Sequence, residues 1–135
     1  MKNTDDAIII DLYHLKFATR GVVSTEIKNL YEVCGQAQKS LIWKYKENAE
    51  FFNHLIKREY KKQRNGQTRI RKGDIELLEK LLFEAKWNKE LKFNISIVQP
   101  GFSRDTVTQS ILNLLGVTSN HLKKEGGINL RVIAS

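Results

Sequence analysis

Residues 8–40 carry the sequence IIIDLYHLKFATRGVVSTEIKNLYEVCGQAQKS, and this stretch decides the fold. Its three isoleucines form a continuous apolar run, which is typical of a strand covered on both faces. The pattern then alternates, which places Asp11 and Tyr13 on one face of the strand and His14 and Lys16 on the other. A loop and a long amphipathic helix follow. The stretch therefore predicts a buried strand that carries one line of polar side chains.

Two further strands are predicted downstream of this stretch. Residues 92–99 alternate and end at Pro100-Gly101, and residues 128–134 form the last predicted strand after a turn at Gly126-Gly127. The helical pattern between these two segments is a crossover of the length that implies parallel pairing. We therefore expect an α/β fold with a small mixed, largely parallel three-stranded sheet and packed helices, in the order β-α-α-β-α-β. Residues 1–6 are polar and are expected to be frayed.

The helices are predicted from apolar residues that recur every three or four positions. The long helix after the first strand ends at Asn65-Gly66, and a break near residues 46–48 would divide it in two. Asp74 is the expected N-cap of the next helix, whose buried stripe would include Leu77. Gly116 is expected to interrupt the last helix.

The composition fits one globular domain over residues 1–135. Hydrophobic residues make up 41% of the chain and charged residues 28%, which is enough for a core without disulfides. The single cysteine, Cys34, falls on an apolar helical stripe, so we expect a core residue and a reducing, cytoplasmic compartment. No apolar run approaches the roughly 18 residues of a membrane span, and no signal peptide is visible.

A basic segment, residues 57–72, accounts for most of the net charge of +8. It holds eight basic residues and one acid, Glu59, which gives the segment a charge of +7. The basic residues are Lys57, Arg58, Lys61, Lys62, Arg64, Arg69, Arg71 and Lys72. Such a concentration is what neutralising nucleic-acid phosphates requires, so these residues are candidate nucleic-acid ligands. The alternative is an ordinary solvated helix end and loop.

The candidate catalytic residues are His14 and Lys16 at the end of the first strand and Gln36 on the helix after it, beside the candidate nucleic-acid ligands Lys39 and Ser40. His14 and Lys16 share one strand face, and Gln36, Lys39 and Ser40 share one helical face. A metal-ligating group two residues before a lysine suits phosphodiester hydrolysis. The first group holds the metal ion, and the lysine stabilises the negative charge that develops in the transition state. The alternative is a strand end and a helix surface whose polar groups meet solvent.

These residues resemble the later half of the PD-(D/E)xK nuclease superfamily, in its RecB-like and restriction-type branches. The shared order is a strand that ends in x-x-K, a loop, and a helix that carries Gln with a hydroxyl residue four positions later. The resemblance covers roughly residues 7–43. It implies that His14 stands in the carboxylate place, Lys16 is the motif lysine, Gln36 is the motif glutamine and Ser40 takes the place of a tyrosine. It further implies a Mg²⁺-dependent deoxyribonuclease of restriction or phage defence, with Lys39 and Ser40 beside the DNA.

The sequence departs from that pattern at the first metal-binding aspartate, which the superfamily carries on an earlier strand. Only six residues precede Ala7. Asp11 is the nearest candidate to join His14 at a metal, and a strand bulge would be needed to turn it to that face. Either another chain or segment supplies the missing carboxylate, or the domain binds nucleic acid without cutting it. We therefore expect a fragment or subunit of a larger nuclease-like protein, with dimerisation as one route to a complete site.

Two alternatives remain. The chain would be a non-catalytic protein-protein interaction or oligomerisation module if the polar line were a contact surface. The turn at residues 99–103 ends a strand and starts a helix, where anions often bind, although a structural turn is the favoured interpretation. Trp43 and Trp87 are expected to pack on the core rather than to stack on bases.

Overall fold

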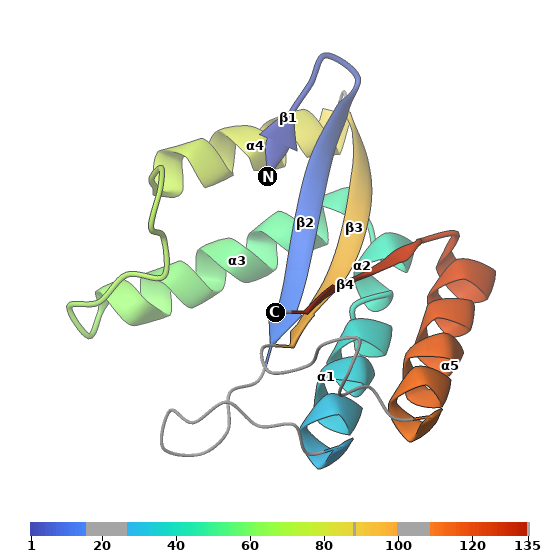
Figure 1. The fold of residues 1–135 in the computed structure, drawn as a ribbon. Coiled ribbons are helices and arrows are strands. Elements are labelled where there is room, and N and C mark those ends of the chain that lie inside the picture. The colour runs from blue at the N-terminus through green and yellow to red at the C-terminus, as the bar shows by residue number, and fades with distance from the viewer. Residues whose placement is uncertain (16–26, 88, 100–108, 135) are drawn as a thin grey trace. The chain divides into compact units, whose positions relative to one another are not determined.

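The structure, a computed structural model, describes residues 1–15, 27–87, 89–99 and 109–134, and these form a mixed α/β fold (Figure 1). The described strands make one four-stranded sheet in the order β1-β2-β3-β4. Their bounds are β1 Lys2–Asn3, β2 Ala7–Leu15, β3 Glu90–Gln99 and β4 Leu130–Ala134. Lys16 and residues 100–103 of the predicted turn lie outside the described residues.

The sheet is mixed and largely parallel, as predicted. β1 pairs antiparallel with β2, and β3 pairs parallel with β4. Strands β2 and β3 run in the same direction, as two contacts show: one joins the starts of the two strands, and the other joins residues further along both. At the start the Glu90 amide donates to the carbonyl of Asp6, and further on the Asn94 amide side chain donates to Asp11.

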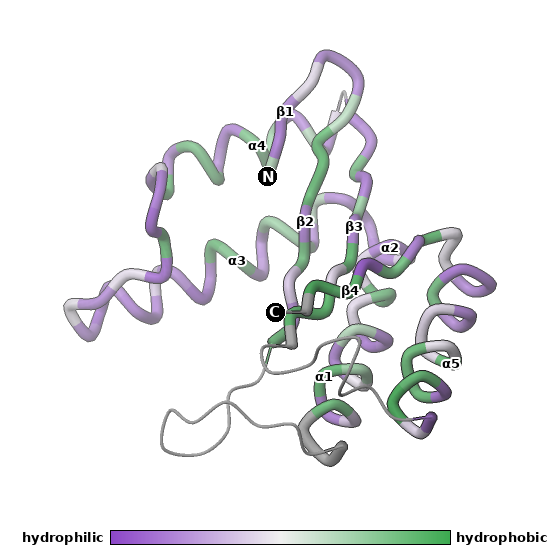
Figure 2. Tube along the Cα trace, in the orientation of Figure 1, coloured by the Kyte–Doolittle hydropathy of each residue, from purple (hydrophilic) through white to green (hydrophobic). Residues whose placement is uncertain are grey.

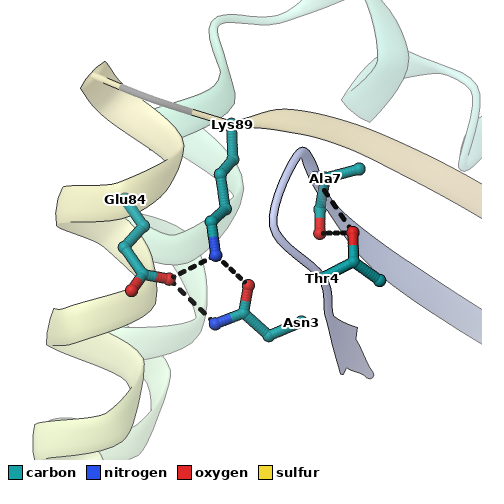
Figure 3. Close-up of polar contacts among 5 residues, drawn as sticks. All are labelled: Asn3, Thr4, Ala7, Glu84 and Lys89. Carbon is teal, nitrogen blue, oxygen red and sulfur yellow. Dashed lines mark hydrogen bonds and ion pairs between the residues drawn. The ribbon is translucent and has the colours of Figure 1, made fainter.

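The prediction of three strands is wrong, because residues 2–3 form the edge strand β1. The hydroxyl of Thr4 donates to the carbonyl of Ala7 at 2.9 Å and accepts from its amide at 3.1 Å. This turn folds the polar N-terminal residues back against β2. Figure 3 shows a second tether, in which the ammonium of Lys89 contacts both Asn3 and the Glu84 carboxylate, at 2.6 and 3.3 Å.

Five helices are present among the described residues. Their bounds are α1 Ile27–Lys39, α2 Ile42–Tyr45, α3 Asn48–Gln63, α4 Ile75–Trp87 and α5 Gln109–Gly126. The predicted break near residues 46–48 is confirmed, since α2 ends at Tyr45 and α3 begins at Asn48. The predicted interruption at Gly116 is wrong, because α5 runs through it; one glycine costs a helix only about 1 kcal/mol.

The chain divides into two compact units, each with its own buried side chains. Unit 1 comprises Met1–Ile10 and Trp43–Lys92, and in it α3 packs beside α4 (Figure 1). Unit 2 comprises the described residues of Asp11–Ile42 and Phe93–Ser135, and in it α1 packs beside α5. The isoleucine run at the start of β2 is buried or half-buried, which confirms a strand covered on both faces.

Three single-residue expectations have clear outcomes. Cys34 is buried in unit 2, as predicted, and its burial raises the pKa of the thiol. Leu77 is 46% exposed and Trp87 is 65% exposed, so the predictions that they lie in the core are wrong. The buried positions of α4 are Leu81 and Ala85, which define a narrower stripe than predicted.

Within the described part of the chain, the helices are all too short or too polar to cross a membrane.

Two glycines in open surroundings provide a test of this backbone. Gly116 lies inside α5 and Gly66 has a φ of +71°, and an added Cβ would meet nothing within 4 Å at either. We expect Gly116→Ala to stabilise the protein by about 0.5–1 kcal/mol in urea unfolding, because alanine is the better helix former. Gly66→Ala should destabilise it by roughly 1–2 kcal/mol, because a side chain disfavours positive φ. Destabilisation by Gly116→Ala would contradict a continuous α5.

Candidate functional site

The basic segment in unit 1 comprises the C-terminal half of α3 and the loop that leads to α4. Seven of its eight basic residues are exposed, and Lys62 is half-buried. In Figure 2 the end of α3 and the loop after it are mostly coloured as hydrophilic. The basic residues near the helix end also face the negative end of the α3 dipole, which favours cations there. The predicted basic surface is therefore present on one continuous stretch of unit 1.

The one acid of the segment, Glu59, is not part of this exposed surface, because its side chain points inward. Glu59 is 1% exposed. One carboxylate oxygen accepts from the Thr68 hydroxyl at 2.5 Å and from the Gln63 side chain at 3.2 Å, and the other accepts from the Arg69 amide at 2.8 Å. Hydrogen bonds to an ionised group are among the strongest in proteins. The carboxylate thus ties the loop at residues 68–69 to α3.

The ionisation of Glu59 is stabilised by the same contacts. The Thr68 hydroxyl and then the Arg69 amide hold the pKa of Glu59 below its ordinary value of 4.5, against an opposing effect of burial. The Thr68 hydroxyl also accepts from the Ile70 amide at 3.1 Å, which tightens the turn. At neutral pH the loop is therefore held by a charged acceptor that has three donors.

A cationic pocket lies between the C-terminal end of α3 and this loop. It has a volume of about 290 Å³ and is lined by Arg58, Lys61, Lys62, Asn65 and Arg69. The first four residues are spaced i, i+3, i+4 and i+7, so they follow one face of α3 and its extension. The loop adds Arg69, whose backbone is fixed by Glu59. Four of the five lining side chains are cationic, and none is acidic.

His54 lies one turn before the pocket on α3. Burial, followed by the charges of Arg58, Arg69, Lys46 and Lys57, holds the pKa of His54 below its ordinary value of 6.5. Its ring lies 5.0 Å from that of Trp43, which is half-buried against Phe51. Trp43 thus packs as predicted.

In unit 2, the structure brings His14, a predicted catalytic residue, together with Ser40, a predicted nucleic-acid ligand. Nε2 of His14, on β2, lies 2.7 Å from the Ser40 hydroxyl at the end of α1. That hydroxyl also lies 3.0 Å from the backbone carbonyl of Gln36. A hydroxyl has one proton to donate, so both contacts are satisfied when His14 donates to Ser40 and Ser40 donates to Gln36. Burial lowers the pKa of His14 below 6.5, which keeps the ring neutral at pH 7.

The side chains of the other predicted site residues of unit 2 do not join the contact between His14 and Ser40 among the described residues. The side chains of Gln36 and Lys39 are exposed, whereas Ser40 is buried and its hydroxyl is engaged by His14 and Gln36. Gln36 therefore meets the pair through its backbone carbonyl. Lys16, the predicted charge-stabilising residue, lies outside the described residues.

The carboxylate of Asp11 lies on the exposed face of β2. It accepts from the Asn94 side chain at 3.0 Å, and the burial of β2 alternates between Asp11 and His14 as a regular strand requires. The bulge that would turn Asp11 toward His14 is not seen in the described part of β2. Over the ranges that the structure describes, no three His, Cys, Asp or Glu side chains are gathered as metal ligands require.

Comparison of the chain with protein-family models, curated proteins and solved structures finds no match.

Sequence reasoning missed the role of Glu59 and the contribution of Asn65. A signal for Glu59 was present, because it lies seven residues after the buried Phe52 and so continues the apolar face of α3. An acid on that face must find donors when it is buried. Its partners in the loop, nine and ten residues later, follow no helical or strand spacing and could not be identified from the sequence.

The contacts of Glu59 predict how stability depends on pH. Its folded-state pKa is below 4.5, so the carboxylate contributes stability that is fully present above pH 4.5 and is lost as pH falls through the folded pKa. Glu59→Gln removes this contribution and places an amide among three donors. We expect the variant to unfold at lower urea than the wild type at pH 7, with the difference shrinking below pH 4.5. An equal difference at pH 7 and pH 3 would contradict a charged Glu59.

Proposed function

We propose that the chain binds nucleic acid through the basic segment of unit 1. The observation that carries this proposal is the inward placement of Glu59, which leaves a surface of seven exposed cations without a neighbouring exposed acid in the segment. Phosphate contacts by lysine and arginine release counterions, and this supplies most of the affinity of sequence-independent binding. The side chains of the segment suit contacts to the backbone more than reading of base edges.

The salt dependence of binding tests this proposal. Alanine at Lys57, Lys61 and Arg71 removes three candidate phosphate contacts. The slope of log K against log salt concentration should then become shallower by about 2–3, since each contact contributes roughly 0.7–0.9. The measurement is fluorescence anisotropy of labelled single-stranded and duplex DNA over 50–200 mM salt, a range that follows from the same counterion effect.

The matched control removes the same charge elsewhere. Lys80 on α4 and Lys123 and Lys124 on α5 are exposed and lie outside the basic segment. Their combined replacement by alanine should leave the slope nearly unchanged. Equal slopes for the two triple variants would mean that net charge alone drives binding, and an absence of salt-dependent binding would remove the proposal.

Cleavage by a PD-(D/E)xK-like mechanism is a second proposal, and the contact between His14 and Ser40 supports it. Two motif-matched residues, 26 positions apart, meet at 2.7 Å in unit 2. If His14 helped to hold Mg²⁺, it would do so through Nδ1, because Nε2 contacts Ser40. The ion would polarise the phosphodiester, and Lys16 would stabilise the charge that develops. A carboxylate ligand from another chain or segment would complete such a site, as the resemblance to a defence nuclease implies.

A nicking assay tests the cleavage proposal. Supercoiled plasmid and purified protein should give nicked product with Mg²⁺ and none with excess chelator. Lys16→Ala should reduce the rate by at least about 100-fold, the scale of losing one stabilising charge in the transition state. Salt-dependent binding without nicking would leave a binding domain only. Nicking that Lys16→Ala leaves unchanged would exclude the proposed mechanism.

A protein-protein contact is the alternative function, and the outer face of α4 supports it. Phe83 and Trp87 lie one helical turn apart and are 63% and 65% exposed. Large apolar side chains that gather on a surface often mark a binding partner. A concentration-dependent mass shift that Phe83→Ala and Trp87→Ala abolish, with no affinity for DNA, would favour this alternative. A cytoplasmic setting is proposed for either function.

A further inference from the structure

The cationic pocket in unit 1 gathers more charge than one internal phosphate carries. Arg58, Lys61, Lys62 and Arg69 line a single hollow together with Asn65. An internal phosphodiester carries one negative charge, whereas a phosphomonoester carries about 1.5–2 negative charges at pH 7 and offers three acceptor oxygens. The more highly charged group is the better match for four converging cations.

The size of the pocket agrees with an end group. Its volume is about 290 Å³. A phosphate group together with part of the attached sugar would fit such a space. The amide of Asn65 adds a neutral donor, and the two arginines can each form paired hydrogen bonds to phosphate oxygens.

Hydrogen bonds within unit 1 hold the loop that lines the pocket. Glu59 fixes the backbone of Arg69, and the amide of Gln67 donates to the Lys62 carbonyl at 3.0 Å. Lys62 also contacts the Gln67 side chain at 3.4 Å. The C-terminal dipole of α3, equivalent to about half a unit of negative charge, and the buried Glu59 carboxylate both oppose an anion, and the four cations outweigh them. Because the contacts with Glu59 and Lys62 already hold the loop, it does not have to fold when a ligand binds.

We propose that the cationic pocket binds a phosphomonoester, and that its ligand is the phosphorylated end of a nucleic-acid strand. This inference rests on the proposed nucleic-acid binding and names the group that anchors it. The other cations of the segment would contact the internal phosphates that follow. The pocket would then set the position of the strand end relative to the protein.

Binding of matched oligonucleotides tests the inference. Three DNA strands of one sequence are compared by anisotropy: one with a 5′-phosphate, one with a 3′-phosphate and one with hydroxyls at both ends. The hydroxyl strand is also measured with inorganic phosphate added. One phosphorylated strand should bind about tenfold tighter than the hydroxyl strand, the factor expected of one or two further charge-assisted hydrogen bonds. Lys61→Ala with Arg69→Ala should remove this preference, because both side chains line the pocket while the Arg69 amide still reaches Glu59.

The control pair is Arg71→Ala with Lys72→Ala, which removes the same charge outside the pocket. It should weaken binding of all strands and leave the end preference intact. Salt-dependent binding without an end preference would overturn this inference and leave the proposed function standing. Absence of binding to every strand would overturn both.

A spectroscopic readout separates a strand end from a free nucleotide. Neutralising Arg58 and Arg69 should raise the pKa of His54, which NMR titration of the ring measures. A phosphorylated strand should raise this pKa at lower concentration than a nucleoside monophosphate does. Equal affinity for the two ligands would assign the pocket to free nucleotides and would overturn the strand-end proposal.

Discussion

The buried carboxylate of Glu59 is the interaction on which the basic surface of unit 1 depends. A buried charge is costly unless donors surround it, and Glu59 has three, from Thr68, Arg69 and Gln63. The consequence is both structural and electrostatic. The loop is fixed to α3, and the one negative charge of the segment is withdrawn from the surface. Glu59 thus fixes the loop without placing an acidic side chain on the exposed basic surface.

The same principle explains the polar pair in unit 2. His14 projects from β2 toward the end of α1, where Ser40 links its ring to the Gln36 carbonyl. Burial favours a neutral ring, and the hydrogen bonds fix its orientation. This arrangement would suit a residue that positions a metal or a phosphate, and it would equally suit a structural strand end. Cleavage would depend on the residues that meet Nδ1 of His14, whereas the proposed binding depends on the basic segment of unit 1. Different experiments therefore test the two proposals.

Much of the fold could be predicted because its signals are local. The apolar run of Ile8 to Ile10, the alternation after Asp11 and the cap at Asp74 each act within a few residues. The cap is confirmed by the bond from the Leu77 amide to the Asp74 carboxylate at 2.8 Å. The edge strand β1 was missed because its polar residues are held by Thr4, Glu84 and Lys89 rather than by apolar burial. The site was predicted only in part, because the contacts of Glu59 and Ser40 join residues whose spacing carries no periodic signal. Trp87 was misplaced because helical spacing cannot tell which aromatic residues a partner element covers.

Amide hydrogen exchange at Arg69 tests the central claim most directly, because this amide donates to the buried carboxylate of Glu59. The account predicts that the Arg69 amide exchanges at least about tenfold more slowly than the amides of Arg71 and Lys72 in the same loop. It also predicts that Glu59→Gln accelerates exchange at Arg69 while exchange in the middle of α5 is unchanged. Exchange at Arg69 as fast as at Arg71 and Lys72 in the wild-type protein would contradict a loop fixed by Glu59.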